Sequence, residues 1–140
     1  MSVFKNSLSV VTGVVTGIIL ISVGEYLLPH FYPFPVEINI NDRTQLQSAI
    51  QQMPLGASLF LLVNYAVASF VAGCLATLLI KKVPVKKEIN KIRPALICGT
   101  VFTLSGISNS IMIGHPLWFS VANLFVYIPF AYLGYKLVKQ

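Results

Sequence analysis

Lys81–Arg93 reads KKVPVKKEINKIR, and it carries six of the ten basic residues of the chain but only one of its four acids. Long apolar segments lie on both sides of this stretch. Short loops rich in Lys and Arg stay in the cytosol in multi-pass membrane proteins. The stretch therefore predicts a cytosolic loop between two membrane-spanning halves. Its basic side chains are expected to contact lipid headgroups: Lys81, Lys82, Lys86, Lys87, Lys91 and Arg93.

The composition argues against an ordinary soluble domain. Of the 140 residues, 56% are hydrophobic and 10% are charged, whereas about a quarter of the residues in a soluble domain are charged. The net charge of +6 comes from residues that flank apolar segments, and the sequence offers no polar, aromatic-studded surface on which bases would stack. We therefore expect no nucleic-acid partner. The expected partners are membrane lipids, including anionic lipids that attract a nearby Lys or Arg by about 1 kcal/mol, and other membrane proteins or a second copy of the chain.

Four apolar segments are long enough to cross a bilayer, which takes about 20 helical residues. They cover approximately residues 8–28, 59–80, 95–113 and 117–135. The predicted fold class is all-α: residues 1–140 form a single domain, a polytopic membrane protein with four transmembrane helices in two antiparallel hairpins.

The distribution of basic residues predicts the orientation. Along the four segments, nine of the ten basic residues lie on one side, and Arg43 lies on the other side together with Glu37 and Asp42. Because Lys and Arg collect on the cytosolic side, we expect both termini to be cytosolic. The predicted location is the cell inner membrane, with residues 31–58 as the outer loop.

The outer loop contains the signals of one short helix. Asn41 or Asp42 can cap its start, and it should end near Met53, before Pro54 and Gly56. We expect this helix to lie across the outer mouth of the bundle, more simply as a connector than as a lid over a substrate. Its apolar stripe follows the helical repeat at Leu46, Ala49, Ile50 and Met53.

Small residues and prolines predict how the helices pack and where they end. Glycine and alanine at helical spacing let neighbouring backbones approach closely. Pro29 is expected to end the first helix, and Pro129 is expected to bend the fourth, because proline has no N–H to donate. The predicted packing residues are Gly13, Gly17, Gly24, Ala68, Ala72, Ala76, Gly99 and Gly106.

Strongly polar side chains recur at one depth. At about 1.5 Å per helical residue, four of them lie roughly 7–11 Å below the outer boundary, one in each helix, and two histidines stand just above. The functional interpretation is an outward-facing pocket for a cation, a proton or a small ligand, because ionisable groups in a membrane usually face a wet cavity or the bundle interior. The residues are Glu25, Asn64, Asn109 and Asn123, with His30 and His115.

A structural interpretation competes with the pocket. A carboxyl group hydrogen-bonded to asparagines would hold the helices in register, and amides commonly join membrane helices. For Glu25 both interpretations remain open. For Asn64, Asn109 and Asn123 the structural interpretation is the more economical one.

The sequence contains no catalytic, phosphate-binding or metal-binding signature. We therefore expect no enzyme, no cofactor and no metal. The function favoured by the sequence is a small non-enzymatic accessory or scaffold subunit. The alternative is a small transporter or a protein that binds an ion or ligand at Glu25. A third hypothesis is a membrane enzyme that acts at the outer interface through His30, His115 and Glu25.

Three short segments carry a resemblance. Met53–Ala57 (MPLGA), Val71–Gly73 (VAG) and His115–Phe119 (HPLWF) resemble segments of small four-helix integral membrane proteins of bacteria. The resemblance covers most of the chain and implies a bacterial inner-membrane location. It brings no activity with it.

Overall fold

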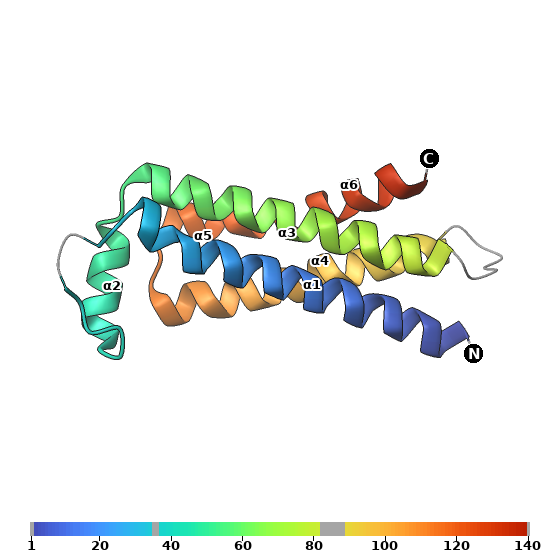
Figure 1. Cartoon of the computed structure of the whole chain (residues 1–140), viewed down its shortest axis with the longest axis horizontal. Coiled ribbons are helices and arrows are strands. Elements are labelled where there is room, and N and C mark those ends of the chain that lie inside the picture. The colour runs from blue at the N-terminus through green and yellow to red at the C-terminus, as the bar shows by residue number, and fades with distance from the viewer. Residues whose placement is uncertain (1, 35–36, 82–88, 140) are drawn as a thin grey trace.

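The computed structural model describes residues 2–34, 37–81 and 89–139, and every regular element in these ranges is a helix. The all-α prediction is therefore confirmed for the described residues. Lys82, Lys86 and Lys87 of the predicted loop lie outside them. In chain order the helices are α1 (Ser2–Phe31), α2 (Arg43–Gln51), α3 (Leu55–Lys81), α4 (Ile89–Ile113), α5 (Leu117–Leu124) and α6 (Tyr127–Lys139) (Figure 1).

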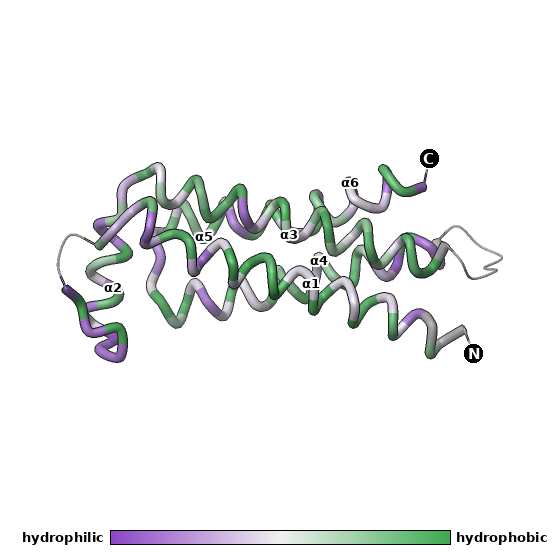
Figure 2. Tube along the Cα trace, in the orientation of Figure 1, coloured by the Kyte–Doolittle hydropathy of each residue, from purple (hydrophilic) through white to green (hydrophobic). Residues whose placement is uncertain are grey.

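Four stretches of helix are long and apolar enough to cross a membrane. They are Asn6–Phe31, Leu55–Ile80, Lys91–Ile113 and Leu117–Lys139, of which the last combines α5 and α6. Figure 2 shows hydrophobic residues along most of these helices and hydrophilic residues gathered at α2. The long helices also leave large apolar side chains exposed, such as Ile19, which is 56% exposed.

The long helices form an elongated bundle around α3. Helix α3 packs against α1, α4 and α6, and α1 also contacts α4. Both chain termini lie at one end of the bundle, and α2 lies across the opposite end (Figure 1). We call these the terminal end and the α2 end. The short loop helix thus lies across one end of the bundle, as the sequence predicts.

The start of α2 follows the predicted capping chemistry. The Asp42 side chain accepts a hydrogen bond from the backbone N–H of Thr44 at 2.9 Å. This bond satisfies one of the N–H groups that the first helical turn leaves unpaired. Ala49 and Ile50 of the predicted apolar stripe are buried.

The predicted end of the first helix, at residue 28, is wrong by three residues. Helix α1 continues through Pro29 to Phe31, and the Tyr32 N–H still bonds to the Leu28 carbonyl at 2.8 Å. Proline removes only its own N–H, so the donors that follow it can continue the helical pattern. Pro29 consequently leaves the Glu25 backbone carbonyl without its usual partner.

Pro129 has a larger effect than Pro29. The segment predicted as one bent helix is divided into α5 and α6, with Phe125 and Val126 between them. There the N–H of Phe125 bonds to the Ala122 carbonyl, three residues back instead of four. Because Pro129 has no N–H for the Phe125 carbonyl, the regular ladder cannot pass this point.

Small residues lie where the helices approach most closely. A Cβ atom on Gly13 would lie 2.9 Å from the Ala72 carbonyl oxygen of α3 and 2.9 Å from the Cys98 sulfur of α4. Ala68, Ala72 and Ala76 are fully buried. Gly17 faces the Phe102 ring, and Gly99 and Gly106 face α6.

Among the described residues, the closest approach between two helix backbones involves Gly73 and Gly134. A Cβ on Gly73 would collide with the Ala131 backbone, and one on Gly134 would collide with the Phe70 carbonyl. Helices α3 and α6 therefore meet almost backbone to backbone. This contact fixes the position of Tyr127, at the start of α6, relative to α3.

Candidate ligand cavities at Glu25

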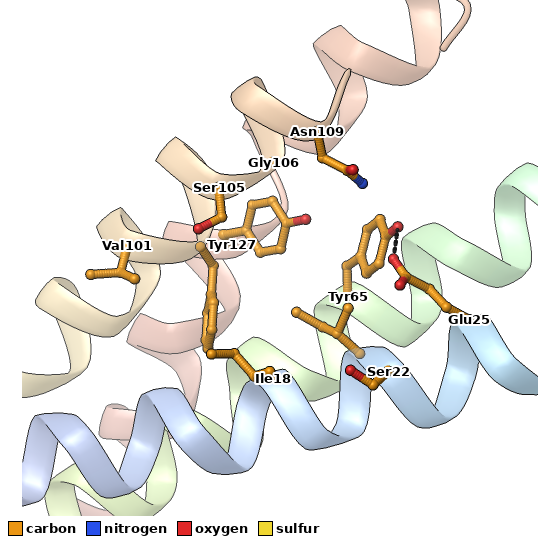
Figure 3. A pocket seen from close by; sticks show the side chains of 11 residues that line it. Ile18, Ser22, Glu25, Tyr65, Val101, Ser105, Gly106, Asn109 and Tyr127 are labelled. Carbon is orange, nitrogen blue, oxygen red and sulfur yellow. Dashed lines mark hydrogen bonds between the residues drawn. The ribbon is translucent and has the colours of Figure 1, made fainter. Parts of the chain in front are cut away.

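Glu25 is an exposed residue near the α2 end of α1. Its Oε1 atom accepts a hydrogen bond of 2.9 Å from the Tyr65 hydroxyl of α3 (Figure 3). The bond satisfies the phenol, which is otherwise buried at 3% exposure. Among the described residues, no hydrogen bond is found to the second carboxylate oxygen.

A cavity of about 300 Å³ lies beside Glu25. Helices α1 and α4 form its sides, and Tyr65 of α3 and Tyr127 of α6 project into it between them (Figure 3). Ile18, Ser22 and Ser105 on its sides are themselves exposed, so it opens between α1 and α4. We call it the seam cavity, and its lining is Ile18, Ile21, Ser22, Glu25, Tyr65, Val101, Phe102, Ser105, Gly106, Asn109 and Tyr127.

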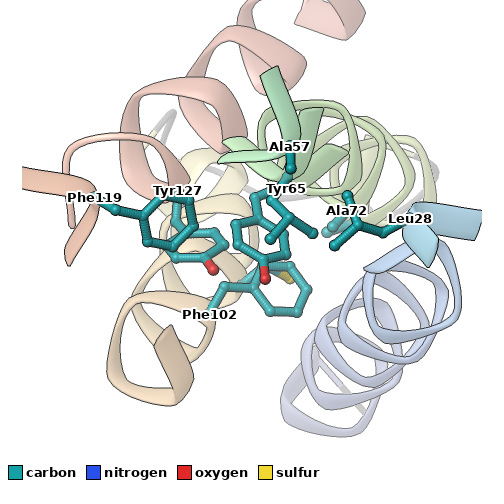
Figure 4. Packing of buried hydrophobic residues seen from close by; sticks show 10 residues of the cluster. Leu28, Ala57, Tyr65, Ala72, Phe102, Phe119 and Tyr127 are labelled. Atoms are coloured by element: carbon teal, nitrogen blue, oxygen red, sulfur yellow. The ribbon is translucent and has the colours of Figure 1, made fainter. Parts of the chain in front are cut away.

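Three aromatic rings line the seam cavity. The ring centroids of Tyr65 and Tyr127 are 5.8 Å apart, with 30° between the planes. Phe102 lies 6.1 Å from Tyr127. Each ring comes from a different helix, and all three belong to the buried apolar cluster in Figure 4. The core of the bundle therefore supplies one wall of the cavity.

A second cavity, of about 250 Å³, lies beneath α2. It shares Glu25, Tyr65 and Asn109 with the seam cavity. Glu25 thus stands where a space that reaches the α2 end meets a space that opens between α1 and α4. We call the second space the α2 cavity, and its further lining is Leu28, Pro29, Phe34, Ile50, Met53, Leu61, Ile113 and His115.

The described lining of the two cavities contains an acid and no Lys or Arg. Among the described residues that line them, Glu25 is the one acid and none is Lys or Arg. His115 is the remaining group that could become cationic, and its ring packs 4.6 Å from that of Phe119. Burial lowers the pKa of His115 below its ordinary value. A neutral imidazole gives Glu25 no counter-charge.

The structure brings together three of the six residues proposed from the sequence as a pocket. Glu25 and Asn109 line both cavities, and His115 lines the α2 cavity. His30 lies apart from them: it is exposed, and its ring packs 5.5 Å from that of Tyr26.

The remaining two residues of that set lie in helix contacts. The Asn64 side chain packs against Gly24, and its Nδ2 atom donates a hydrogen bond of 3.2 Å to the Ile21 carbonyl. Asn123 is buried, with its amide against Gly106 of α4. Both asparagines lie in helix contacts, but the predicted bond between the Glu25 carboxyl and an asparagine is not found among the described residues: Glu25 accepts from Tyr65 instead.

Tyr65 and Tyr127 are site residues that the sequence analysis missed. Both lie in apolar segments, where the aromatic ring makes tyrosine resemble the hydrophobic residues around it. A signal existed, because a buried phenol needs a hydrogen-bond partner. For Tyr65, one residue after Asn64 in the polar layer, the acceptor is Glu25.

The predicted lipid-binding residues that can be placed lie at the terminal end. Lys91 and Arg93 belong to the first turns of α4, and Arg93 is exposed. Arg93 also lines a further cavity of about 450 Å³, between the terminal halves of α1 and α4. Helices α1 and α4 thus separate toward both ends and meet near Gly13 and Gly17.

Comparison with known proteins adds no relative: no protein-family model, no curated protein and no solved structure matches the chain. The resemblance to small bacterial membrane proteins therefore stays a prediction.

Proposed function

We propose that the chain is an integral membrane protein that binds, and carries across the membrane, a small ligand at Glu25. Its four long helices cross the bilayer in two antiparallel pairs, with both termini in the cytosol and α2 on the outer surface. The length and apolar character of the helices support this placement, as does the side preference of Lys and Arg. The location is the inner membrane of a bacterial cell.

One observation carries the proposal: two cavities meet at an acid that has no cationic partner among the described residues that line them. A carboxylate at membrane depth is costly, and such groups usually mark ligand or ion pathways. A purely structural Glu25 would sit in a packed helix contact, as Asn64 does. This contrast moves our proposal from the accessory subunit favoured by the sequence to its alternative, a small transporter or ligand-binding protein.

The third cavity favours transport over binding alone. The seam cavity and the cavity beside Arg93 lie along the same pair of helices, on either side of the contact near Gly13 and Gly17. A modest rocking of α1 against α4 about this contact would open one cavity and narrow the other. Movement of one bundle element against another around a central site is how many transporters alternate access.

The test is to isolate the full chain from its native membrane in nanodiscs and to identify bound small molecules by native mass spectrometry. We expect a small molecule on the wild-type chain and on Glu37→Gln, which removes an equal charge from the outer loop. Glu25→Gln should carry none. A wild-type chain that carries no small molecule and remains attached to a second protein contradicts this proposal and supports the accessory-subunit function.

A further inference from the structure

We propose that the ligand of the seam cavity is an organic cation, with an alkylated or protonated amine next to an apolar group. This inference rests on the proposed function and names its ligand class. It is drawn from the charge, the aromatic wall and the opening of the cavity.

The charge of the cavity selects a cation. Glu25 presents a carboxylate to both cavities, and no Lys or Arg is found among the described residues lining them. A carboxyl group at membrane depth is costly unless a partner lies close by. A bound ammonium group would be such a partner while the Tyr65 hydroxyl holds the other side of the carboxylate.

The aromatic wall selects an organic cation over a metal ion. Phe102, Tyr65 and Tyr127 line the space that Glu25 faces, and aromatic faces attract quaternary and protonated amines. A calcium ion would need about six to eight oxygen ligands. Among the described residues, no three His, Cys, Asp or Glu side chains come close enough to hold a metal ion.

The opening of the cavity selects a ligand with an apolar part. Ile18 is 52% exposed and lies with Val101 in the lining contributed by α1 and α4. In the proposed orientation this side of the cavity faces lipid. A ligand that partitions into the outer leaflet can enter between α1 and α4, place its amine at Glu25 and leave its apolar group near Ile18. The volume of about 300 Å³ suits a compact molecule of this kind.

The amine can belong to a free molecule or to the headgroup of a lipid in the outer leaflet. The recognised chemistry is the same in both cases. Nanodiscs made of phosphatidylglycerol, with and without phosphatidylethanolamine, separate the two sources. If a lipid amine occupies the cavity, phosphatidylethanolamine will weaken the binding of an added cation; if the natural ligand is a free amine, the affinity will be equal in both discs.

The experiment compares two probes of the same shape, benzyltrimethylammonium and its neutral carbon analogue neopentylbenzene. Binding to the full chain in mild detergent is measured by calorimetry, with empty micelles as the blank. We expect the cation to bind at least about tenfold more tightly, because the Glu25 carboxylate attracts the cation and not its neutral analogue. A hundredfold excess of sodium chloride over the probe should not displace it.

Variants assign the binding to Glu25 and to the rings. Glu25→Gln should lower the affinity for the cation at least about tenfold and remove the preference over neopentylbenzene. Glu37→Gln is the matched control and should bind like the wild type. Tyr127→Leu should weaken cation binding roughly threefold or more, whereas Tyr127→Phe, which keeps the aromatic face, should not. If Tyr127→Leu fails to fold, the Glu25 and Glu37 pair still decides the test.

The ligand class and the proposed function can fail separately. If neopentylbenzene binds as tightly as the cation, or if Glu25→Gln loses no affinity, the organic-cation assignment is wrong. In that case the native preparations are compared. If the wild-type chain carries a small molecule that Glu25→Gln lacks, the proposed function stands with a different ligand. If wild-type chain binds neither probe and carries no small molecule, both fall.

Discussion

Asn64 and Glu25 lie at neighbouring levels of the α1–α3 pair, yet their surroundings differ. Asn64 packs over Gly24 and reaches the Ile21 carbonyl, so a close helix contact uses its polarity. Glu25 follows Gly24 by one residue, about 100° around the helix, and faces two cavities. Depth in the bundle therefore does not separate a structural polar residue from a candidate ligand group; the space in front of the side chain does.

The two faces of α1 differ in the same way: one makes a close helix contact and the other borders cavities. Toward α3, Gly13 and Gly24 keep the backbones close over several turns. Toward α4, close contact is confined to the level of Gly13 and Gly17, and cavities lie above and below it. We infer that the α1–α3 face stabilises the bundle and that the α1–α4 face is available for function.

Gly24→Leu should produce the largest effect, because the new side chain would occupy the position of the Asn64 amide. We expect a loss of about 2–3 kcal/mol in the free energy of unfolding. Unfolding in mixed micelles can be followed through the fluorescence of Trp118, the one tryptophan of the chain. Val23→Leu, at an exposed position one residue away, should change the stability by less than about 0.5 kcal/mol. Equal losses in both variants would contradict the tight α1–α3 contact.

Asn64→Ala and Asn109→Ala sharpen the comparison between the two kinds of asparagine. The first removes a hydrogen bond between helices and should cost about 1–2 kcal/mol. The second enlarges a cavity that already exists and should cost less than about 0.5 kcal/mol. The measurement is the same unfolding experiment. A larger loss for Asn109→Ala would reverse our assignment of the two residues.

Tyr65→Phe should have a smaller effect. It removes the hydrogen bond to Glu25 and leaves the ring in place, so we expect a loss of about 0.5–1 kcal/mol. Glu25→Gln should cost less than this, because its amide oxygen can still accept the bond. The measurement is the free energy of unfolding of both variants. If Glu25→Gln lowers it more than Tyr65→Phe does, the carboxylate has a structural role.

The smallest expected effect is the pH dependence that comes from His115. Burial lowers its pKa in the folded protein below the unfolded value of 6.5. Below that value the unfolded chain takes up a proton more readily than the folded chain, so the stability is complete above pH 6.5 and falls as the pH drops toward the folded pKa. His115→Gln should flatten this part of the stability profile. A stability that rises as the pH falls from 6.5, and that this variant abolishes, would contradict the assignment.

The parts of the fold that depend on local chemistry could be predicted from the sequence. The four apolar stretches follow from hydropathy, and α2 follows from the capping side chain of Asp42. The exact ends could not be predicted, because a proline can be tolerated within a helix, as Pro29 is, or can divide one, as Pro129 does. Which case occurs depends on packing beyond the local sequence.

The site was predictable in its central residue but not in its shape. An acid in an apolar segment identified Glu25, and counting along the helices placed Asn109 near it. The cavities depend on where α1 and α4 separate. Gly13 and Gly17 mark the level at which the two helices meet, but the sequence does not show how far the helices diverge on either side of that contact. For the same reason Asn64 could not be separated from Asn109 before the helices were assembled.

The central claim is that an open cavity lies beside Glu25 on one side of α1 and connects through the α2 cavity to the outer surface, and thiol accessibility tests it most directly. Ser22→Cys and Val23→Cys are introduced separately after Cys74 and Cys98 have been replaced by Ala, and intact vesicles are treated with a charged, membrane-impermeant thiol reagent. Ser22 lines the seam cavity, whereas Val23 is exposed outside it. We predict that the cysteine at position 22 reacts rapidly from the outer side and that the cysteine at position 23 does not. Equal protection of both would contradict an open cavity at Glu25.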